Sequence, residues 1–341
     1  MQASSPVKQS MKFTPVLPYL ANKYRQSSEL QQRIDGLLKS VGLPLIGMVV
    51  FLLIWAGAAA NIQTSLGTFP GPVAVYEQAN NLIDEHLAER NKAKAFYERQ
   101  EQRNVERLAQ DPTYEAKIRP YTGKPTFLDQ IGTSLLTVLT GFAVASAIAI
   151  PLGIMIGLSN GLYMAFNPLI QLFKPVSPLA WLPLVTMVVS AVYVSDDPLF
   201  QKSFVNSAIT VLLCSLWPTL INTAVGVSNV SKDLQNVSKV LRLDWFSHVR
   251  VIVIPSAIPM VFTGLRLSLG VAWMVLIAAE MLAQNPGLGK FVWDEFQNGS
   301  SNSLGRIMVA VLTIGLIGFG LDRAMLVLQR HLSWDKSQAT R

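Results

Sequence analysis

The sequence lacks the residues for several kinds of chemistry, namely disulfide bonds, metal clusters and nucleotide hydrolysis. Only one of its 341 residues is cysteine, so the chain can form neither an internal disulfide nor a cysteine-based metal cluster. The three histidines, His86, His248 and His331, are scattered and give no zinc-binding pattern. No G-x-x-x-x-G-K-S/T phosphate loop is present, so we expect no ATP hydrolysis, no cofactor and no metal site in this chain itself.

Charged residues are also scarce. They make up 14% of the chain, against about 25% in a typical soluble domain. Hydrophobic residues make up 50% and the mean hydropathy is +0.36, which is the composition of a membrane protein. The net charge of +7 does not indicate a nucleic-acid partner, because the basic residues lie in short segments between apolar runs and form no aromatic-interleaved patch. Basic cytoplasmic loops of a membrane protein explain them better.

Six apolar runs are long enough to cross a bilayer, for which about 20 residues suffice. They are Leu43–Ala60, Ile131–Leu158, Pro168–Val194, Ser203–Val225, Val253–Ala283 and Leu304–Leu328. Proline and glycine interrupt several of these runs, which predicts tilted or broken helices whose free backbone groups are satisfied by their neighbours. The sequence therefore predicts an all-α, polytopic membrane protein, a helical bundle with about six transmembrane helices.

The basic residues predict the orientation of the spans. The tail 1–42 carries six Lys or Arg against two acidic residues, and the tail 331–341 is also basic, so both termini are expected in the cytoplasm of a bacterial inner-membrane protein. With six spans the loop 228–252 is cytoplasmic too, and its basic residues again outnumber the acidic ones. The stretch WAGAAANIQ at 55–63 resembles a signal-peptidase site. Because the residues before it are too many for an ordinary signal n-region, we expect the first span, 43–60, to be retained.

One long hydrophilic insert, 61–127, follows the first span and is expected in the periplasm. From Gly71 to Arg119 its pattern is helical, with Pro72 in a first-turn position and apolar residues at spacings of three and four. Its acidic and basic residues balance. A solvated helical pair with intrahelical ion pairs is the favoured interpretation, and a binding surface for an external partner is the alternative.

The cytoplasmic loop contains the stretch KVLRLDWFSHVRVIVIPSAIP at 239–259. Leu234, Val237, Leu241 and Trp245 recur at helical spacing, which predicts one short amphipathic helix along the membrane face with an apolar side for a partner groove. Pro255 is expected to start a new helix in another direction. On this pattern alone, a surface-lying helix with snorkelling Lys and Arg is an equal alternative.

This loop resembles the signature loop of ABC importer permeases, which is written E-A-A, three residues, G, nine residues, I-x-L-P. Ile252, Ile254 and Pro255 match the end of the motif, whereas Asn236, Val237 and Ser238 stand at the E-A-A positions and Arg242 at the glycine position. The segments PVSPLAWLPL (175–184), FTGLRLSLGVAWMVLIAAEMLAQNPGLG (262–289) and LDRAMLVLQRHLSW (321–334) resemble the nitrate, sulfonate, taurine and bicarbonate permease group. The insert and the basic tail resemble in particular the permease subunit of cyanobacterial nitrate/nitrite importers.

The resemblance implies the type I ABC importer permease fold, with a core over 128–330 that holds five transmembrane helices. It implies a homodimer of two permease copies, two cytoplasmic ATPase subunits that bind ATP and Mg, and a periplasmic solute-binding protein that delivers a small inorganic anion. Nitrate or nitrite is the first expectation, with bicarbonate, cyanate or a sulfonate such as taurine as alternatives. The residues expected to couple to the ATPase are Leu234, Asn236, Val237, Ser238, Leu241, Arg242 and Trp245. A self-contained secondary transporter or channel is the rival class, but the sequence shows no inverted repeat of broken helices to support it.

Two ionisable residues, Arg266 and Glu280, lie within the fifth apolar run and are functional candidates for that reason. They lie fourteen residues apart, about 21 Å along a straight helix, so each needs a partner on another element. For Arg266 a structural salt bridge or a snorkelling position is favoured over a role in attracting the anion. The candidate lining residues of the translocation pathway are Thr263, Arg266, Ser268, Trp273 and Glu280.

Overall fold

The computed structural model describes residues 38–64, 67–111, 113–116, 118–194, 200–300 and 302–332. Nearly all of this chain is helical, which confirms the predicted all-α class, and the two-residue strands β1 (Gln63–Thr64) and β2 (Gly67–Thr68) pair with each other. Among the described residues, five helices are long and apolar enough to cross a membrane, or six if one bent helix pair counts as a span. The predicted cytoplasmic tails 1–42 and 331–341 lie almost wholly outside the described residues.

The chain divides into two units, Met1–Gln63 and Thr64–Arg341. In the first unit a π-helical turn, η1 (Leu38–Gly42), leads into α2 (Leu43–Asn61), which corresponds to the predicted first span. Its side chains are apolar on every side and most of them are exposed within this chain. A helix that is hydrophobic all round suits a lipid environment.

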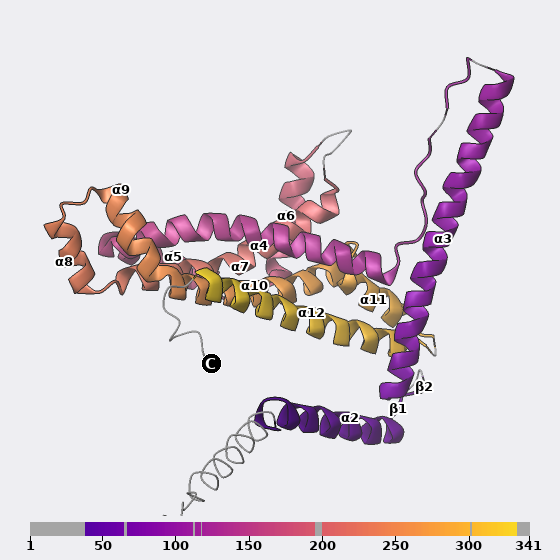
Figure 1. The fold of residues 1–341 in the computed structure, drawn as a ribbon, viewed down its shortest axis with the longest axis horizontal. Helices are drawn as coiled ribbons and strands as arrows, with labels where there is room; N and C mark the ends of the chain where they lie inside the picture. Colours follow the sequence, from indigo (N-terminus) through magenta and orange to yellow (C-terminus); the bar gives the residue numbers. More distant parts are fainter. Residues whose placement is uncertain are drawn as a thin grey trace, which may run out of the picture. The chain divides into compact units, whose positions relative to one another are not determined.

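The second unit begins with the hydrophilic insert, whose main element is α3 (Pro72–Gln110). The predicted helical pair is wrong: α3 is one 39-residue helix, about 58 Å long, and a non-helical return segment runs back beside it (Figure 1). The sequence explains the single helix, because no glycine or proline interrupts it between Val73 and Gln110. We call α3 and its return segment, residues 72–124, the arm.

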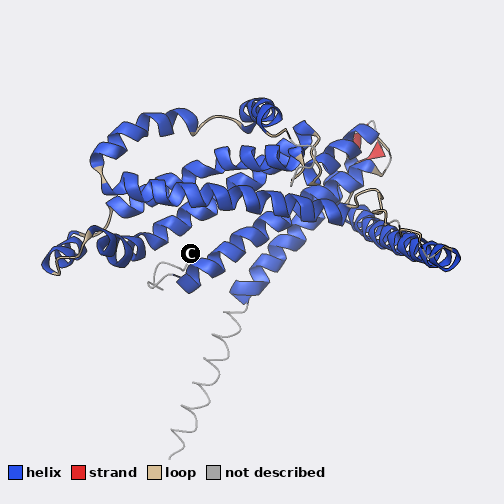
Figure 2. Cartoon of the chain, turned by 90° about the horizontal axis from the view of Figure 1, so that it is seen from above, coloured by secondary structure: helices blue, strands red, loops and turns tan. Residues whose placement is uncertain are grey.

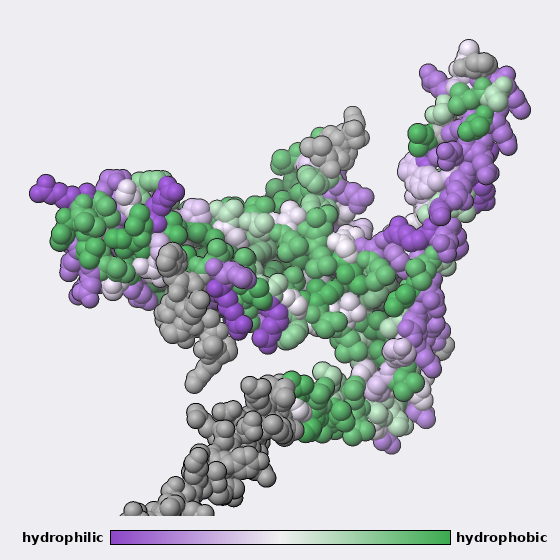
Figure 3. Space-filling model, viewed as in Figure 1, coloured by the Kyte–Doolittle hydropathy of each residue, from purple (hydrophilic) through white to green (hydrophobic). Residues whose placement is uncertain are grey.

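The core of this unit is formed by α4 (Phe127–Leu158), α7 (Lys202–Ser228), α10 (Ile254–Ala283) and α12 (Ser303–Leu332). These helices run roughly along one direction, and α7 packs against both α4 and α10 (Figures 1 and 2). Glycines allow the close approach: a Cβ atom at Gly157 of α4 would lie 2.6 Å from the Ala224 carbonyl oxygen of α7. Small residues at such crossings are the usual device for packing helices in lipid. The space-filling view shows apolar side chains over this bundle and polar side chains along the arm (Figure 3).

The third predicted span, Pro168–Val194, is not one helix. Its residues are divided between α5 (Asn160–Phe173) and α6 (Pro178–Val192), which meet at an angle of 97°. Pro175 explains the break, because it lacks an amide donor and disfavours helical conformation in the residue before it. Ser177 then caps α6 by accepting a hydrogen bond from the Leu179 amide at 3.2 Å.

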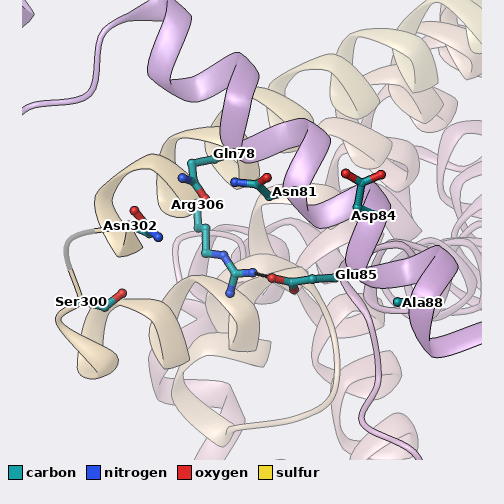
Figure 4. A pocket seen from close by; sticks show the side chains of 8 residues that line it. All are labelled: Gln78, Asn81, Asp84, Glu85, Ala88, Ser300, Asn302 and Arg306. Carbon is teal, nitrogen blue, oxygen red and sulfur yellow. Dashed lines mark hydrogen bonds and ion pairs between the residues drawn. The ribbon is translucent and has the colours of Figure 1, made fainter. Parts of the chain in front are cut away.

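The remaining helices connect the core elements. α8 (Lys232–Val240), α9 (Trp245–His248) and the π-helical turn η2 (Val249–Val253) lie between α7 and α10, and α11 (Leu288–Asn298) lies between α10 and α12. At the other end of the bundle from α8, the root of the arm is fastened to the start of α12 (Figures 1 and 4). There Arg306 forms ion pairs with Glu85 of α3 and Glu295 of α11. These contacts lie beside a polar cleft of about 590 Å³.

Candidate functional site

The loop between α7 and α10 is a helix, a tight turn and a second helix. The predicted single helix through Trp245 is wrong, because α8 ends at Val240 and Trp245 begins α9. Two hydrogen bonds close the end of α8: the Leu243 amide donates to the Ser238 carbonyl and the Arg242 amide donates to the Lys239 carbonyl, both at 3.1 Å. This pair of bonds is a Schellman motif, which terminates a helix with one residue in left-handed conformation.

Arg242 is the left-handed residue of this turn, with φ of 50°. It stands at the glycine position of the signature motif, and glycine is the residue that adopts positive φ without steric cost. The arginine therefore adopts a backbone conformation that glycine favours, although the residue type differs from the motif. The glycine position of the motif was the sequence signal for this helix end. The helical spacing of apolar residues continues through the turn and therefore predicted a longer helix.

Substitutions at Arg242 test this geometry. Arg242→Gly is expected to keep or slightly raise stability, whereas Arg242→Val is expected to cost about 1–2 kcal/mol, because a β-branched residue fits the left-handed region poorly. The thermal midpoint of the purified protein measures both effects. Equal behaviour of the glycine and valine variants would contradict the assigned turn.

The corner of the chain lies at this turn and not at Pro255. The prediction that Pro255 starts a helix in a new direction is wrong, since residues Trp245–Ala283 form one continuous helical span. The π-helical turn η2 precedes the proline, and the Ile254 amide donates to the Val249 carbonyl. The helix continues through Pro255 because this residue, the second of α10, follows a turn with shifted hydrogen bonding.

At the start of α9, Asp244 accepts hydrogen bonds from Ser247, and these hydrogen bonds lower the pKa of the Asp244 carboxyl group.

An uncovered apolar surface lies on this loop. Leu234, Val237, Leu241 and Trp245 are 41%, 49%, 63% and 66% exposed. Asn236 and Arg242 are exposed as well, whereas Ser238 is buried and shares a 2.8 Å hydrogen bond with Nδ1 of His248. Val240 and Phe246 extend the exposed surface. The sequence did not indicate them, because neither fits the apolar spacing of one continuous helix. We call Leu234, Val237, Val240, Leu241, Trp245 and Phe246 the coupling patch.

Four of the five pathway candidates are held by contacts with other helices of the chain. Arg266 of α10 pairs with Asp322 of α12, with distances of 3.0 Å from Nε and 2.9 Å from a terminal nitrogen to Oδ1. The Trp273 ring nitrogen donates to the Ile314 carbonyl at 3.0 Å. Asp322 was missed as a partner, although it is the only acidic residue in its apolar run.

Ser268 has a backbone role in the structure. Its hydroxyl donates to the Ser215 carbonyl at 2.5 Å and accepts from the Thr219 amide at 3.0 Å. These two backbone groups stand four residues apart beside Pro218 of α7 and would bond each other in a regular helix. The serine of α10 therefore inserts into the backbone ladder of α7 at its proline and joins the two helices.

Glu280 is 1% exposed and joins three elements. Oγ of Ser134 in α4 lies 2.8 and 2.9 Å from its two carboxylate oxygens, and the Gly289 amide at the start of α11 donates to it at 2.9 Å. The Leu288 amide donates in turn to Ser134. The turn before α11 requires glycine, because Gly287 has φ of 151° and a Cβ atom there would lie 2.2 Å from the carboxylate.

Thr263 is the exposed member of the candidate set. Its hydroxyl donates to the Pro259 carbonyl within α10 at 2.9 Å. With Leu267, Gly270 and Met274 it forms an exposed stripe along α10 at spacings of four and three residues.

The fold and the patch thus define a polytopic helical membrane protein with an uncovered patch on a loop outside its core. Residues 149–334 match the family described as "Binding-protein-dependent transport system inner membrane component". The chain belongs to this family, and the resemblance inferred from the sequence is confirmed.

Individual relatives and a solved structure agree with this assignment. The chain is 32% identical over 303 residues to "Bicarbonate transport system permease protein CmpB" of Synechococcus elongatus, a match covering 89% of this chain and 91% of that protein. It is 36% identical over 200 residues to "Nitrate import permease protein NrtB" of Synechocystis sp., covering 59% and 68%. The permease fold resembles the MetNI methionine ABC transporter in an inward-facing conformation, with a TM-score of 0.51 at 13% identity over 61% of this chain and 96% of that one. This likeness confirms the predicted type I importer permease fold.

Proposed function

We propose that this chain is the permease subunit of an ATP-driven importer of a small inorganic anion. The observation that carries the proposal is the coupling patch, which is uncovered within the chain and lies on the loop that resembles the signature loop of ABC importer permeases. In the assembly two copies line the pathway, and two separate ATPase subunits, which hold ATP and Mg, bind the two patches. A soluble substrate-binding protein delivers the anion from the other side. This chain supplies the pathway and needs no cofactor of its own.

The continuity of α9, η2 and α10 suggests how the ATPase state reaches the membrane. The patch residue Trp245 and the interior residues of α10 belong to one helical span that ends at Ala283. A displacement of the patch by the ATPase dimer is passed along this span to its contacts with α7, α11 and α12. Ser268, Arg266 and Glu280 hold those contacts, so in this proposal they transmit movement and do not bind the anion.

The patch and the arm lie at opposite ends of the bundle (Figure 1), which supports a cytoplasmic coupling loop and a periplasmic arm. Single cysteines at the exposed positions Glu101 and Ser231, in a Cys214→Ser background, are expected to react with an impermeant thiol reagent from opposite sides of the membrane. Labelling of intact cells and of inverted vesicles measures this. Reaction of both from the same side would contradict the proposed orientation of the spans.

Nitrate or nitrite is the proposed substrate, and bicarbonate is the second candidate because the match to a bicarbonate permease extends over 89% of the chain. Uptake into proteoliposomes tests both, using the permease, its ATPase subunits and the soluble substrate-binding protein with labelled nitrate or labelled bicarbonate. ATP-dependent nitrate uptake that requires the binding protein is the expected result. Uptake without ATP or without the binding protein would favour a self-contained transporter instead.

A further inference from the structure

The distal half of the arm projects away from the helical core (Figures 1 and 3). The root of α3 is fixed to the core through Arg306 and through an ion pair between Arg90 and Asp129 of α4. From Phe96 onward the contacts of α3 are with the return segment: the Phe96 and Tyr121 rings lie 5.5 Å apart, and the Arg119 amide donates to Oε1 of Gln100. The described contacts of the distal end are thus within the arm itself.

The return segment is itself well fastened. Tyr121 donates to Glu89 at 2.7 Å, and this hydrogen bond lowers the pKa of Glu89 and raises the pKa of Tyr121. The Tyr121 amide donates to the Tyr97 hydroxyl at 3.0 Å. Gln100, only 8% exposed, holds the segment at Arg119. The arm therefore keeps a defined shape well beyond its last contact with the core.

Between α3 and the return segment lies a cleft of about 320 Å³ near the distal end of the arm. Arg103, Arg107 and Arg119 line it, and none of the described residues that line it is acidic. Arg107 donates to the Tyr114 hydroxyl at 3.3 Å and stacks over its ring at 5.4 Å, while Nε of Arg103 donates to a backbone carbonyl of α3. Within the part of the chain that the structure describes, none of the three guanidinium groups is in an ion pair with a carboxylate.

A cleft lined by three arginines matches carboxylate groups, because a guanidinium group donates two parallel hydrogen bonds to a carboxylate in bidentate geometry. The surroundings indicate a protein and not a small ion. Leu108 and Ile118, next in the chain to Arg107 and Arg119, are 41% and 82% exposed. A small inorganic anion would make no apolar contact with such side chains. Arginine and tyrosine, with exposed aliphatic side chains on the same part of the arm, are typical of protein interfaces.

We propose that the distal end of the arm, centred on Arg103, Arg107 and Arg119, is a docking surface for an acidic protein surface. The partner with that acidic surface is the soluble substrate-binding protein of the importer. This identification of the partner rests on the proposed function. The arginines attract the approaching carboxylates and fix the orientation of the complex, and the apolar side chains beside them exclude water once it has formed. Docking on the arm holds the substrate-binding protein to the permease without a contact inside the membrane.

Charge reversal in the complete complex tests this. The permease with its ATPase subunits in nanodiscs is titrated with the separately purified substrate-binding protein, and both its affinity and its stimulation of ATP hydrolysis are measured. The triple variant Arg103→Glu, Arg107→Glu, Arg119→Glu is expected to weaken binding about tenfold or more, with unchanged ATP hydrolysis in the absence of the binding protein. Higher salt is expected to weaken binding to the unmodified complex more than to the variant. Arg99→Glu is the matched control, since Arg99 lies one turn away on α3, outside the cleft.

The outcomes distinguish an error in the proposed docking surface from an error in the proposed function. Normal binding and stimulation in the triple variant would overturn the docking surface while the proposed function stands. A complex that no substrate-binding protein stimulates would overturn both. Sodium sulfate serves as the small-anion probe. If sulfate stabilises the unmodified complex but not the triple variant, and both bind the substrate-binding protein equally well, the cleft is a small-anion site and not a docking surface.

Discussion

Glu280→Ala is expected to prevent assembly of a stable permease. The substitution removes the acceptor of two buried hydrogen bonds, from Ser134 and from the Gly289 amide, and leaves both donors without it in the interior. Each buried donor left unpaired costs about 1–3 kcal/mol, and the cavity adds to this. Because the carboxylate joins α4, α10 and the start of α11, the loss acts on the packing of all three. The thermal midpoint of the purified protein and its abundance in membranes measure the effect.

Two further variants locate the cause. Glu280→Gln keeps the side-chain volume and one carbonyl acceptor. Its stability is therefore expected to lie between that of the unmodified protein and that of the alanine variant. Asp294→Ala is the control on α11, because Asp294 is a partly exposed acid paired with Lys290 and its removal is expected to cost about 0.5 kcal/mol or less. A Glu280→Ala protein as stable as the Asp294→Ala protein would show that the buried carboxylate does not hold these elements together.

Leu241→Asp is expected to release the ATPase subunits while the membrane fold stays intact. Leu241 lies at the end of α8 in the middle of the coupling patch and is 63% exposed, so an aspartate costs the isolated chain little. In a complex the same charge is buried against a partner, where loss of a central anchor typically costs about 2 kcal/mol or more, roughly thirtyfold in affinity. Co-purification of the ATPase subunits with a tagged permease and ATP-driven uptake measure the two consequences.

Asn229→Asp is the matched control for the coupling patch. Asn229 is exposed at the end of α7, outside the patch, and the substitution adds the same negative charge with almost no change of shape. Full ATPase binding and uptake are expected for this variant. If Leu241→Asp also bound its ATPase and transported normally, the patch would not be the site of coupling.

The positions of the membrane helices were predictable because hydrophobic length is a local property. The runs Ile131–Leu158, Ser203–Val225 and Leu304–Leu328 agree with α4, α7 and α12 to within about four residues at each end. Pro175 and Pro178 were visible signals of the break between α5 and α6, but an apolar run that continues through them gives no angle. The end of α8 had a signal as well, the glycine position of the motif, which here holds Arg242.

The sequence by itself determined that this is a polytopic helical membrane protein and where its long apolar helices lie, because composition and hydrophobic length are carried by neighbouring residues. Only the tertiary structure decided the partners of the polar residues. Arg266 meets Asp322 across 56 residues, and Glu280 meets Ser134 across 146. A buried polar side chain requires some partner, but which one it finds depends on how the helices pack, and helix packing is set by contacts between segments that no local pattern relates.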